Sequence, residues 1–263
     1  MNTGITVIKY GGHAMTDGAL AAAFAADIAA LSGAGGRFVV VHGGGPQITD
    51  LLGRLRVESR FVDGLRVTDA ETMRVVEMAL CGEVNKAVVS AFAQRGVRAV
   101  GLSGRDGGLL RAVVKNPALG LVGQVRSVDA AVLECLLNGG FTPVVAPVGA
   151  GPEGQALNIN ADTAAGAIAG ALKAAAFVLV SDVPGVLGPD KSLLPSLDRA
   201  GAERLRAEGV ISGGMIPKVE ACLHALDAGC GSALILDGRA PSSLRRFLTA
   251  GEPLGTRITS RAA

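Results

Sequence analysis

Aromatic residues are scarce in this sequence, which contains no Trp, one Tyr and seven Phe among 263 residues. Platforms of aromatic side chains on which nucleic-acid bases stack are therefore not expected. The formal net charge is only +2, so a strongly basic surface for a polyanion is not expected either. We expect a protein that binds no nucleic acid.

The few cysteines show no pattern of a metal site or of a disulfide framework. None of them forms a Cys-x-x-Cys pair, and no cluster of histidines lies nearby. We therefore expect no metal site built from protein ligands, and buried, reduced thiols in a cytoplasmic protein. The four are Cys81, Cys135, Cys222 and Cys230.

The sequence also lacks a secretory signal and a membrane span. The N-terminus has no basic region followed by an apolar run, and Lys9 interrupts the first apolar segment. The most apolar long stretch, 163–180, carries Lys173 and two glycines. This pattern is typical of a helix followed by a strand and not of a membrane-spanning helix. We expect no contact with a membrane.

Glycine-rich turns follow two short apolar strands. Residues 5–10 are followed by Gly11 and Gly12, and residues 37–42 are followed by three glycines at 43–45. An Ala-rich helix between the strands completes a βαβ unit, in which the strands run parallel and both turns lie at one edge of the sheet. Backbone N–H groups in such turns can bind phosphate or carboxylate. A plain turn is an equally good interpretation of either motif alone.

Two lysines lie beside glycine turns, although the chain contains neither a P-loop nor a Gly-x-Gly-x-x-Gly dinucleotide motif. Lys9 ends the first strand next to Gly11, and Lys218 follows Gly213 and Gly214 at the start of a helix. Two cations near free N–H groups suit phosphoryl transfer, which depends on positioning and charge neutralisation. The alternative for Lys9 is a lysine that reaches into water from a strand end.

Polar residues concentrate before the small-residue helix at 163–172. Asn158, Asn160 and Asp162 precede it, and helix capping accounts for one of the three but not for all. Arg66 lies on an irregular segment, where an arginine can bind a carboxylate with two parallel hydrogen bonds. A surface arginine without such a role is the alternative.

The remaining pattern predicts an α/β protein with a mostly parallel sheet, as one large domain or two intimate lobes. Apolar residues at helical spacing predict a long helix from 70 to about 94. We expect a surface hairpin from 109–114 and 120–125, and an edge strand at 255–258. Asp27 is expected on the solvated face of the first helix.

Six motifs, taken in order, resemble those of the amino acid kinase family. They are Ile8-Lys9-Tyr10-Gly11-Gly12, Val41-His42-Gly43-Gly44-Gly45, Gly64-Leu65-Arg66-Val67-Thr68, Asn158-Ile159-Asn160-Ala161-Asp162, Ser181-Asp182-Val183-Pro184-Gly185 and Gly213-Gly214-Met215-Ile216-Pro217-Lys218. Each is weak alone, but the ordered set spans nearly the whole chain. The resemblance implies a three-layer αβα sandwich around a mostly parallel open sheet. It also implies an N-terminal lobe, 1–172, for amino-acid binding and dimerisation, and a C-terminal lobe, 173–263, for ATP.

Within that family the series is most similar to the kinases that act on N-acetyl-L-glutamate in arginine biosynthesis. The resemblance implies transfer of the ATP γ-phosphoryl group, with Mg²⁺ arriving on ATP, to the side-chain carboxylate. Such a carboxylate has a pKa of about 4.3 and needs no general base. The implied catalytic residues are Lys9, Lys218 and Asp162. The implied substrate-binding residues are Gly44, Gly45, Arg66 and Asn158. The implied ATP-binding residues are Lys9, Gly11, Gly12, Asp182, Gly213, Gly214, Met215 and Lys218.

Two alternatives remain open at this point: a carrier-protein-linked aminoadipate kinase of lysine biosynthesis, and a non-catalytic amino-acid sensor on the same fold. Family members inhibited by arginine resemble one another in an extra N-terminal helix that links dimers into a hexamer. Here the first strand begins by about Ile5, and residues 1–4 are too short for such a helix. We therefore expect a C2 homodimer that uses the helix at 70–94, with little inhibition by arginine. No role is assigned to His13.

Overall fold

The computed structural model describes residues 4–15, 17–62 and 64–260. An eight-stranded sheet runs through the molecule in the order β12-β14-β13-β11-β1-β2-β8-β5. Its strands are β1 (Ile5–Tyr10), β2 (Arg37–His42), β5 (Ala99–Ser103), β8 (Thr142–Ala146), β11 (Ala176–Ser181), β12 (Ser196–Asp198), β13 (Ala233–Asp237) and β14 (Thr256–Thr259). Every neighbouring pair is parallel except β13 with β14. The predicted mostly parallel sheet is confirmed.

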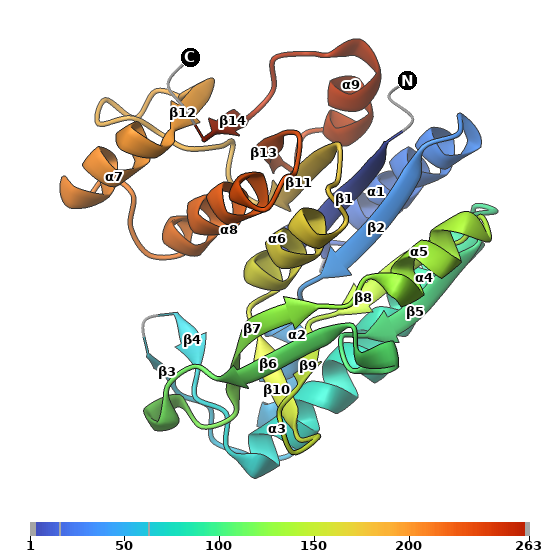
Figure 1. Ribbon diagram of the computed structural model, residues 1–263, viewed down its shortest axis with the longest axis vertical. Helices are drawn as coiled ribbons and strands as arrows, with labels where there is room; N and C mark the ends of the chain where they lie inside the picture. The colour runs from blue at the N-terminus through green and yellow to red at the C-terminus, as the bar shows by residue number, and fades with distance from the viewer. Residues whose placement is uncertain (1–3, 16, 63, 261–263) are drawn as a thin grey trace.

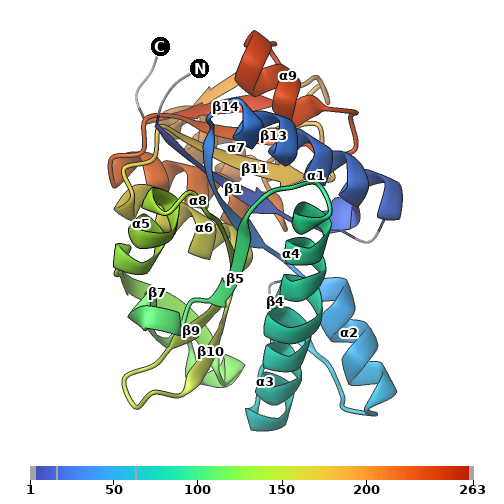
Figure 2. The same ribbon diagram turned by 90° about the vertical axis from the view of Figure 1, so that its right-hand side faces the viewer.

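Helices cover both faces of this sheet (Figure 2). One face carries α5 (Ala131–Asn138), α6 (Ala161–Ala171) and α8 (Met215–Asp227), and the other carries α1 (Gly18–Gly33), α4 (Asn85–Ala93) and α9 (Ser243–Ala250). Side chains alternate along each strand. Thus Val7 joins the core under α6, while the next residue, Ile8, joins the core under α1. The expected three-layer sandwich is confirmed.

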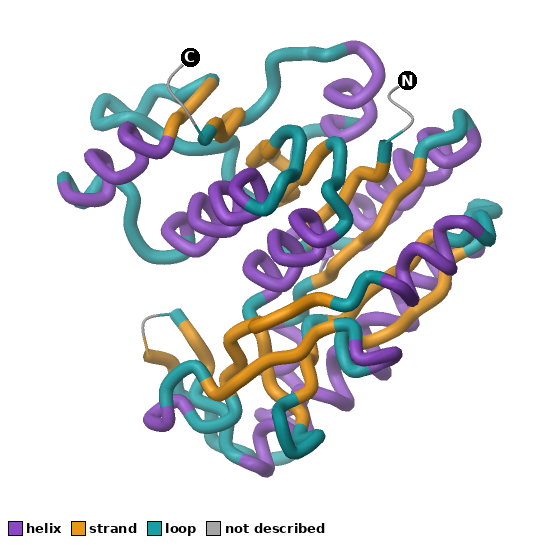
Figure 3. Tube along the Cα trace, viewed as in Figure 1, coloured by secondary structure: helices purple, strands orange, loops and turns teal. Residues whose placement is uncertain are grey.

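Four short strands form a small closed barrel beside the main sheet (Figures 1 and 3). They are β6 (Leu110–Val114), β7 (Val122–Val128), β9 (Val148–Ala150) and β10 (Ala156–Ile159). The expected hairpin is present as β6 and β7, but its placement on the surface was wrong. Leu110 and Val122 are buried, because β9 and β10 close the barrel around them.

The long helix predicted from 70 is present, with an irregularity at its centre. It consists of α3 (Ala70–Glu77), a π-helical segment (Met78–Val84) and α4, which follow one another along one axis in Figure 2. The π-helical segment was not predicted. Before this helix lie α2 (Gly45–Arg54), which has Pro46 in its first turn as expected, and a two-stranded hairpin of β3 (Phe61–Val62) and β4 (Leu65–Arg66).

Three further expectations from the sequence need correction. The strand at 255–258 forms as β14, but it lies between β12 and β13 and not at the edge, because β12 was missed. Asp27 is buried and not solvated, because α9 packs on α1 and its Arg245 N–H donates to the Asp27 carboxylate at 3.3 Å. Cys222 and Cys230 are buried, as expected, but Cys81 is partly exposed and Cys135 is exposed.

The topology places the ends of three central strands side by side. Lys9 pairs in register with Val41 of β2 on one side and with Leu179 of β11 on the other. The turns after β1, β2 and β11 therefore meet at one edge of the sheet, where α6 and α8 also begin (Figure 1). None of the described helices is long and apolar enough to cross a membrane.

Candidate functional site

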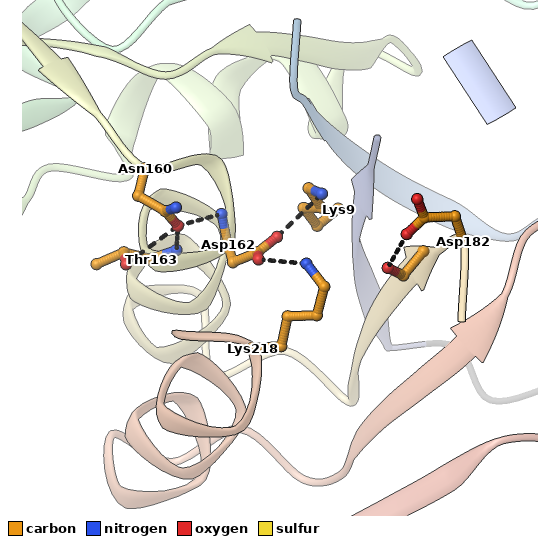
Figure 4. A network of polar contacts seen from close by, with 7 residues as sticks. Lys9, Asn160, Asp162, Thr163, Asp182 and Lys218 are labelled. Atoms are coloured by element: carbon orange, nitrogen blue, oxygen red, sulfur yellow. Dashed lines mark hydrogen bonds and ion pairs between the residues drawn. The ribbon is translucent and has the colours of Figure 1, made fainter. Parts of the chain in front are cut away.

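A carboxylate with two lysines occupies the centre of this edge (Figure 4). The two Asp162 oxygens contact the Lys9 and Lys218 ammonium groups at 3.0 and 2.8 Å. Lys9 comes from the end of β1, Asp162 from the first turn of α6, and Lys218 from the first turn of α8. Asn160 caps α6 by accepting the N–H groups of Asp162 and Thr163, and this fixes the start of the helix.

The electrostatics of this trio favour its charged form. Burial alone would raise the pKa of the Asp162 carboxyl, but Lys9 and Lys218 outweigh it and hold that pKa below its usual value. The side chains of the two lysines are 9% and 15% exposed. One negative and two positive charges therefore sit largely out of water, and the surplus positive charge is available to an anion.

Two glycines at the site leave little room for a side chain. A Cβ at Gly11 would overlap the Lys9 ammonium group, so a side chain there would displace the lysine. Gly44 has a φ of 155° and faces the π-helical segment, where a Cβ would lie 2.5 Å from Leu80 Cδ2. A side chain would be crowded at both positions, and Gly44 also has a backbone conformation that favours glycine.

The four predicted substrate-binding residues line a single pocket. Gly44, Gly45, Arg66 and Asn158 lie together around a cavity of about 200 Å³ that the start of α6 closes. The side-chain nitrogen of Asn158 donates to Thr68 Oγ1 at 3.1 Å, and the side-chain oxygen takes no part in this hydrogen bond. The structure thus brings together residues that lie up to about a hundred positions apart in the sequence.

Arg66 is buried in this pocket, which removes the interpretation of a plain surface arginine. Its guanidinium donates to the Gly45 carbonyl at 3.1 Å, to Thr49 Oγ1 at 2.8 Å and to Ser59 Oγ. It also stacks over the Phe61 ring, 4.6 Å from the ring centroid. These contacts hold the guanidinium in one orientation at the pocket wall. Thr49, Ser59 and Phe61 could not be identified from sequence, because nothing there shows that they surround Arg66.

The predicted ATP-binding residues fall into two groups. Gly12 lies against Asp182, and Ser181 donates to the Asp182 carboxylate at 3.2 Å, so the turns after β1 and β11 touch. Gly213, Gly214 and Met215 lie at the N-terminus of α8, with Gly213 at a φ of 51°. The lysine at 218 connects this second group to the trio around Asp162.

A model of the amino acid kinase family matches residues 4–237. The chain belongs to this family. Among curated amino acid kinases, the acetylglutamate kinase of Granulibacter bethesdensis is 51% identical over an alignment of 267 positions, gaps included, that covers 96% of this chain and 89% of the relative. The acetylglutamate kinase of Novosphingobium aromaticivorans is 48% identical over an alignment of 270 positions, which covers 96% of this chain and 89% of the relative.

Solved structures agree with the family assignment. The protein smu.665 from Streptococcus mutans UA159 is 32% identical with a TM-score of 0.84, over 99% of this chain and all of that one. N-acetylglutamate synthase from Neisseria gonorrhoeae, solved with coenzyme A and N-acetyl-glutamate, is 26% identical with a TM-score of 0.87, over all of this chain and 61% of that one. Carbamate kinase from Giardia lamblia, 17% identical with a TM-score of 0.69, shares the amino acid kinase fold.

Proposed function

We propose that this chain is an acetylglutamate kinase. It transfers the γ-phosphoryl group of ATP to the side-chain carboxylate of N-acetyl-L-glutamate, giving N-acetyl-L-glutamyl 5-phosphate and ADP, in arginine biosynthesis. The names of relatives about 50% identical over nearly the full chain support this substrate. The observation that carries the chemistry is the placement of Lys9 and Lys218 on the two oxygens of one buried carboxylate.

The reaction brings two anions together, and the positive charges of the two lysines offset the repulsion between them. The acceptor carboxylate is ionised at neutral pH, with a pKa of about 4.3, so it attacks without a general base. Lys9 and Lys218 offset the repulsion between that carboxylate and the γ-phosphate, and they stabilise the charge that spreads over the transferring oxygens. Asp162 holds both ammonium groups in place and is a positioning residue in this scheme.

The pocket around Arg66 is the proposed site for N-acetyl-L-glutamate. The guanidinium carries five N–H donors in a planar fork, which matches a carboxylate better than a lysine does. We assign Arg66 to the substrate α-carboxylate, Asn158 to polar atoms beside it, and the N–H groups of Gly44 and Gly45 to the acceptor end. A pocket of about 200 Å³ accommodates a small amino acid.

We place ATP on the side of the lysine pair that faces away from the Arg66 pocket. Gly11, Gly12, Asp182, Gly213, Gly214 and Met215 are the proposed ATP-binding residues, together with Lys9 and Lys218. In the described part of the chain, no three metal-binding side chains cluster. The Asp162 carboxylate is already engaged by both lysines. These residues fit Mg²⁺ that arrives as MgATP and is held mainly by phosphate and water.

The lobe division at 172/173, the cytoplasmic location and the oligomeric state remain predictions. We propose a homodimer that uses the long helix, on which Met78 is 59% exposed. The expectation of little inhibition by arginine depended in part on residues 1–3, which lie outside the described residues. The His13 side chain likewise lies outside them.

A coupled assay of ADP release tests the proposed function. N-acetyl-L-glutamate is expected to support turnover, whereas glutamate and aminoadipate are expected to give at most a small fraction of it. Comparable turnover with aminoadipate would favour the lysine-pathway alternative, which the names of the relatives do not favour. Substrate binding without any ADP release would favour the non-catalytic sensor.

A further inference from the structure

His42 is one of three histidines in the chain, and its ring is completely buried. It ends β2, directly before the glycine turn that lines the proposed substrate pocket. Its Nδ1 lies 2.7 Å from the Gly43 carbonyl oxygen, and its Nε2 lies 3.1 Å from the Asn85 side-chain nitrogen. A carbonyl can only accept and an amide NH₂ can only donate, so these partners require a proton on Nδ1 and none on Nε2.

Asn85 is itself held in one orientation. Its Nδ2 also donates to the Val144 carbonyl at 2.9 Å, and its Oδ1 accepts from the Lys86 ammonium at 3.1 Å. Asn85 is 1% exposed and directly follows the π-helical segment. A π-helical turn adds a residue to the helix and so changes which side chains face inward. The donor face of the Asn85 amide is thereby directed at His42.

The imidazole stays neutral in this setting. Burial lowers the pKa of His42 to about 4; the bond to the Gly43 carbonyl opposes that effect, and the positive charge of Lys86 adds to it. Protonation of Nε2 would also place an N–H against the Asn85 NH₂ group, donor against donor. Both the geometry and the charges therefore select one neutral tautomer.

The Gly43 carbonyl controls the direction of the next N–H group. In a planar trans peptide, the carbonyl of Gly43 and the N–H of Gly44 point in opposite directions. Fixing the first toward His42 fixes the second away from it. In the described part of the chain, the Gly44 N–H donates to no protein acceptor, and Gly44 lines the pocket. It is a donor held ready for a ligand.

We propose that His42, locked by Asn85, is a positioning residue for phosphoryl transfer. Its bond to the Gly43 carbonyl aims the Gly44 N–H at the oxygens on which negative charge develops. This role rests on the proposed kinase function. His42 touches neither substrate in this scheme and transfers no proton.

Two variants test the contacts of Nδ1 and Nε2 separately. The amide nitrogen of Asn matches the position of Nδ1, so His42→Asn retains a donor to the Gly43 carbonyl. The amide of Gln matches Nε2, so His42→Gln retains only the contact with Asn85. We expect His42→Asn to stay within about tenfold of the wild-type kcat, and His42→Gln to lose about 100-fold, the effect of one misdirected transition-state donor.

A purely structural role for His42 would give a different result in these two variants. Both variants lose the buried ring, so their melting temperatures should fall together, whereas kcat should fall mainly in His42→Gln with little change in KM. Equal losses of kcat in both variants, or none in either, would overturn the proposal. His224→Gln is the matched control, because His224 is exposed on α8 and should leave kcat unchanged.

The tautomer can be read in the wild-type protein even if a variant does not fold. ¹⁵N NMR of the histidine rings should show His42 as the neutral Nδ1–H form from pH 5.5 to 8. An Nε2–H form, or titration within that range, would contradict the proposal. If the wild type fails to phosphorylate N-acetyl-L-glutamate, the proposed function is wrong whatever the tautomer. If it is active and His42→Gln retains full kcat, only the positioning role is wrong.

Discussion

Lys218→Ala removes one of the two cations that face the proposed reaction. Lys9, Lys218 and Asp162 together carry two positive charges and one negative charge, a net charge of +1. In the variant Asp162 is paired with Lys9 alone, and the net charge becomes zero. The surplus that neutralises the transferring phosphoryl group is then lost. The loss of one such interaction typically lowers kcat by about 10²–10³-fold, or roughly 3–4 kcal/mol.

The effect should appear in kcat much more than in substrate affinity. The charge of Lys218 is needed most when negative charge spreads over the transferring oxygens, and Lys218 does not line the proposed N-acetyl-L-glutamate pocket. Steady-state kinetics, with calorimetry for the amino-acid substrate, measure the two effects separately. Lys115→Ala, which removes an exposed lysine after β6, is the control. A Lys218→Ala enzyme with normal kcat and a raised KM would refute the assigned role.

Three other outcomes follow from the same structure. Arg66→Lys should weaken N-acetyl-L-glutamate binding by about 1–3 kcal/mol in calorimetry, because lysine cannot form the planar two-point contact; unchanged affinity would remove Arg66 from the site. The pKa of His42 is about 4 in the folded protein and about 6.5 in the unfolded chain. Between these two pH values the unfolded chain binds more protons than the folded protein does. The free energy of unfolding, measured with urea, should therefore fall by up to about 3 kcal/mol as the pH drops from 6.5 to 4. His42→Asn has no imidazole to protonate, so its stability should fall less between pH 6.5 and 4. If the variant loses as much stability as the wild type, other groups cause the loss. Light scattering should give the mass of a dimer, and the mass of a hexamer would contradict the assembly prediction.

The main sheet and its glycine turns were predictable because their signals are local. Strands β1 and β2 are runs of apolar, β-branched residues, and each ends at a glycine turn. The parallel βαβ connection then places both turns at one edge. Lys9 and Lys218 could be singled out because they lie beside such turns. The sequence also showed that capping explains only part of the polar cluster before α6, and Asp162 is the member that pairs with both lysines.

Features that depend on distant partners could not be predicted. Asp27 was expected in water because a helix sequence does not reveal that Arg245, 218 positions away, will pack over it. The barrel buries Leu110 through strands that follow it much later in the chain. The contact between His42 and Asn85 spans 43 positions and depends on a π-helical segment with no clear sequence signal. Tertiary packing, and not local propensity, decides each of these.

The proposed reaction forms an acyl phosphate on N-acetyl-L-glutamate with the help of Lys9 and Lys218. Hydroxylamine converts an acyl phosphate to a hydroxamate, which mass spectrometry identifies by its expected mass. We expect the wild type to form the hydroxamate of N-acetyl-L-glutamate in step with ADP release, and Lys218→Ala to reduce both by about 10²–10³-fold. ADP release without the hydroxamate, or undiminished hydroxamate formation by Lys218→Ala, would contradict the proposed reaction.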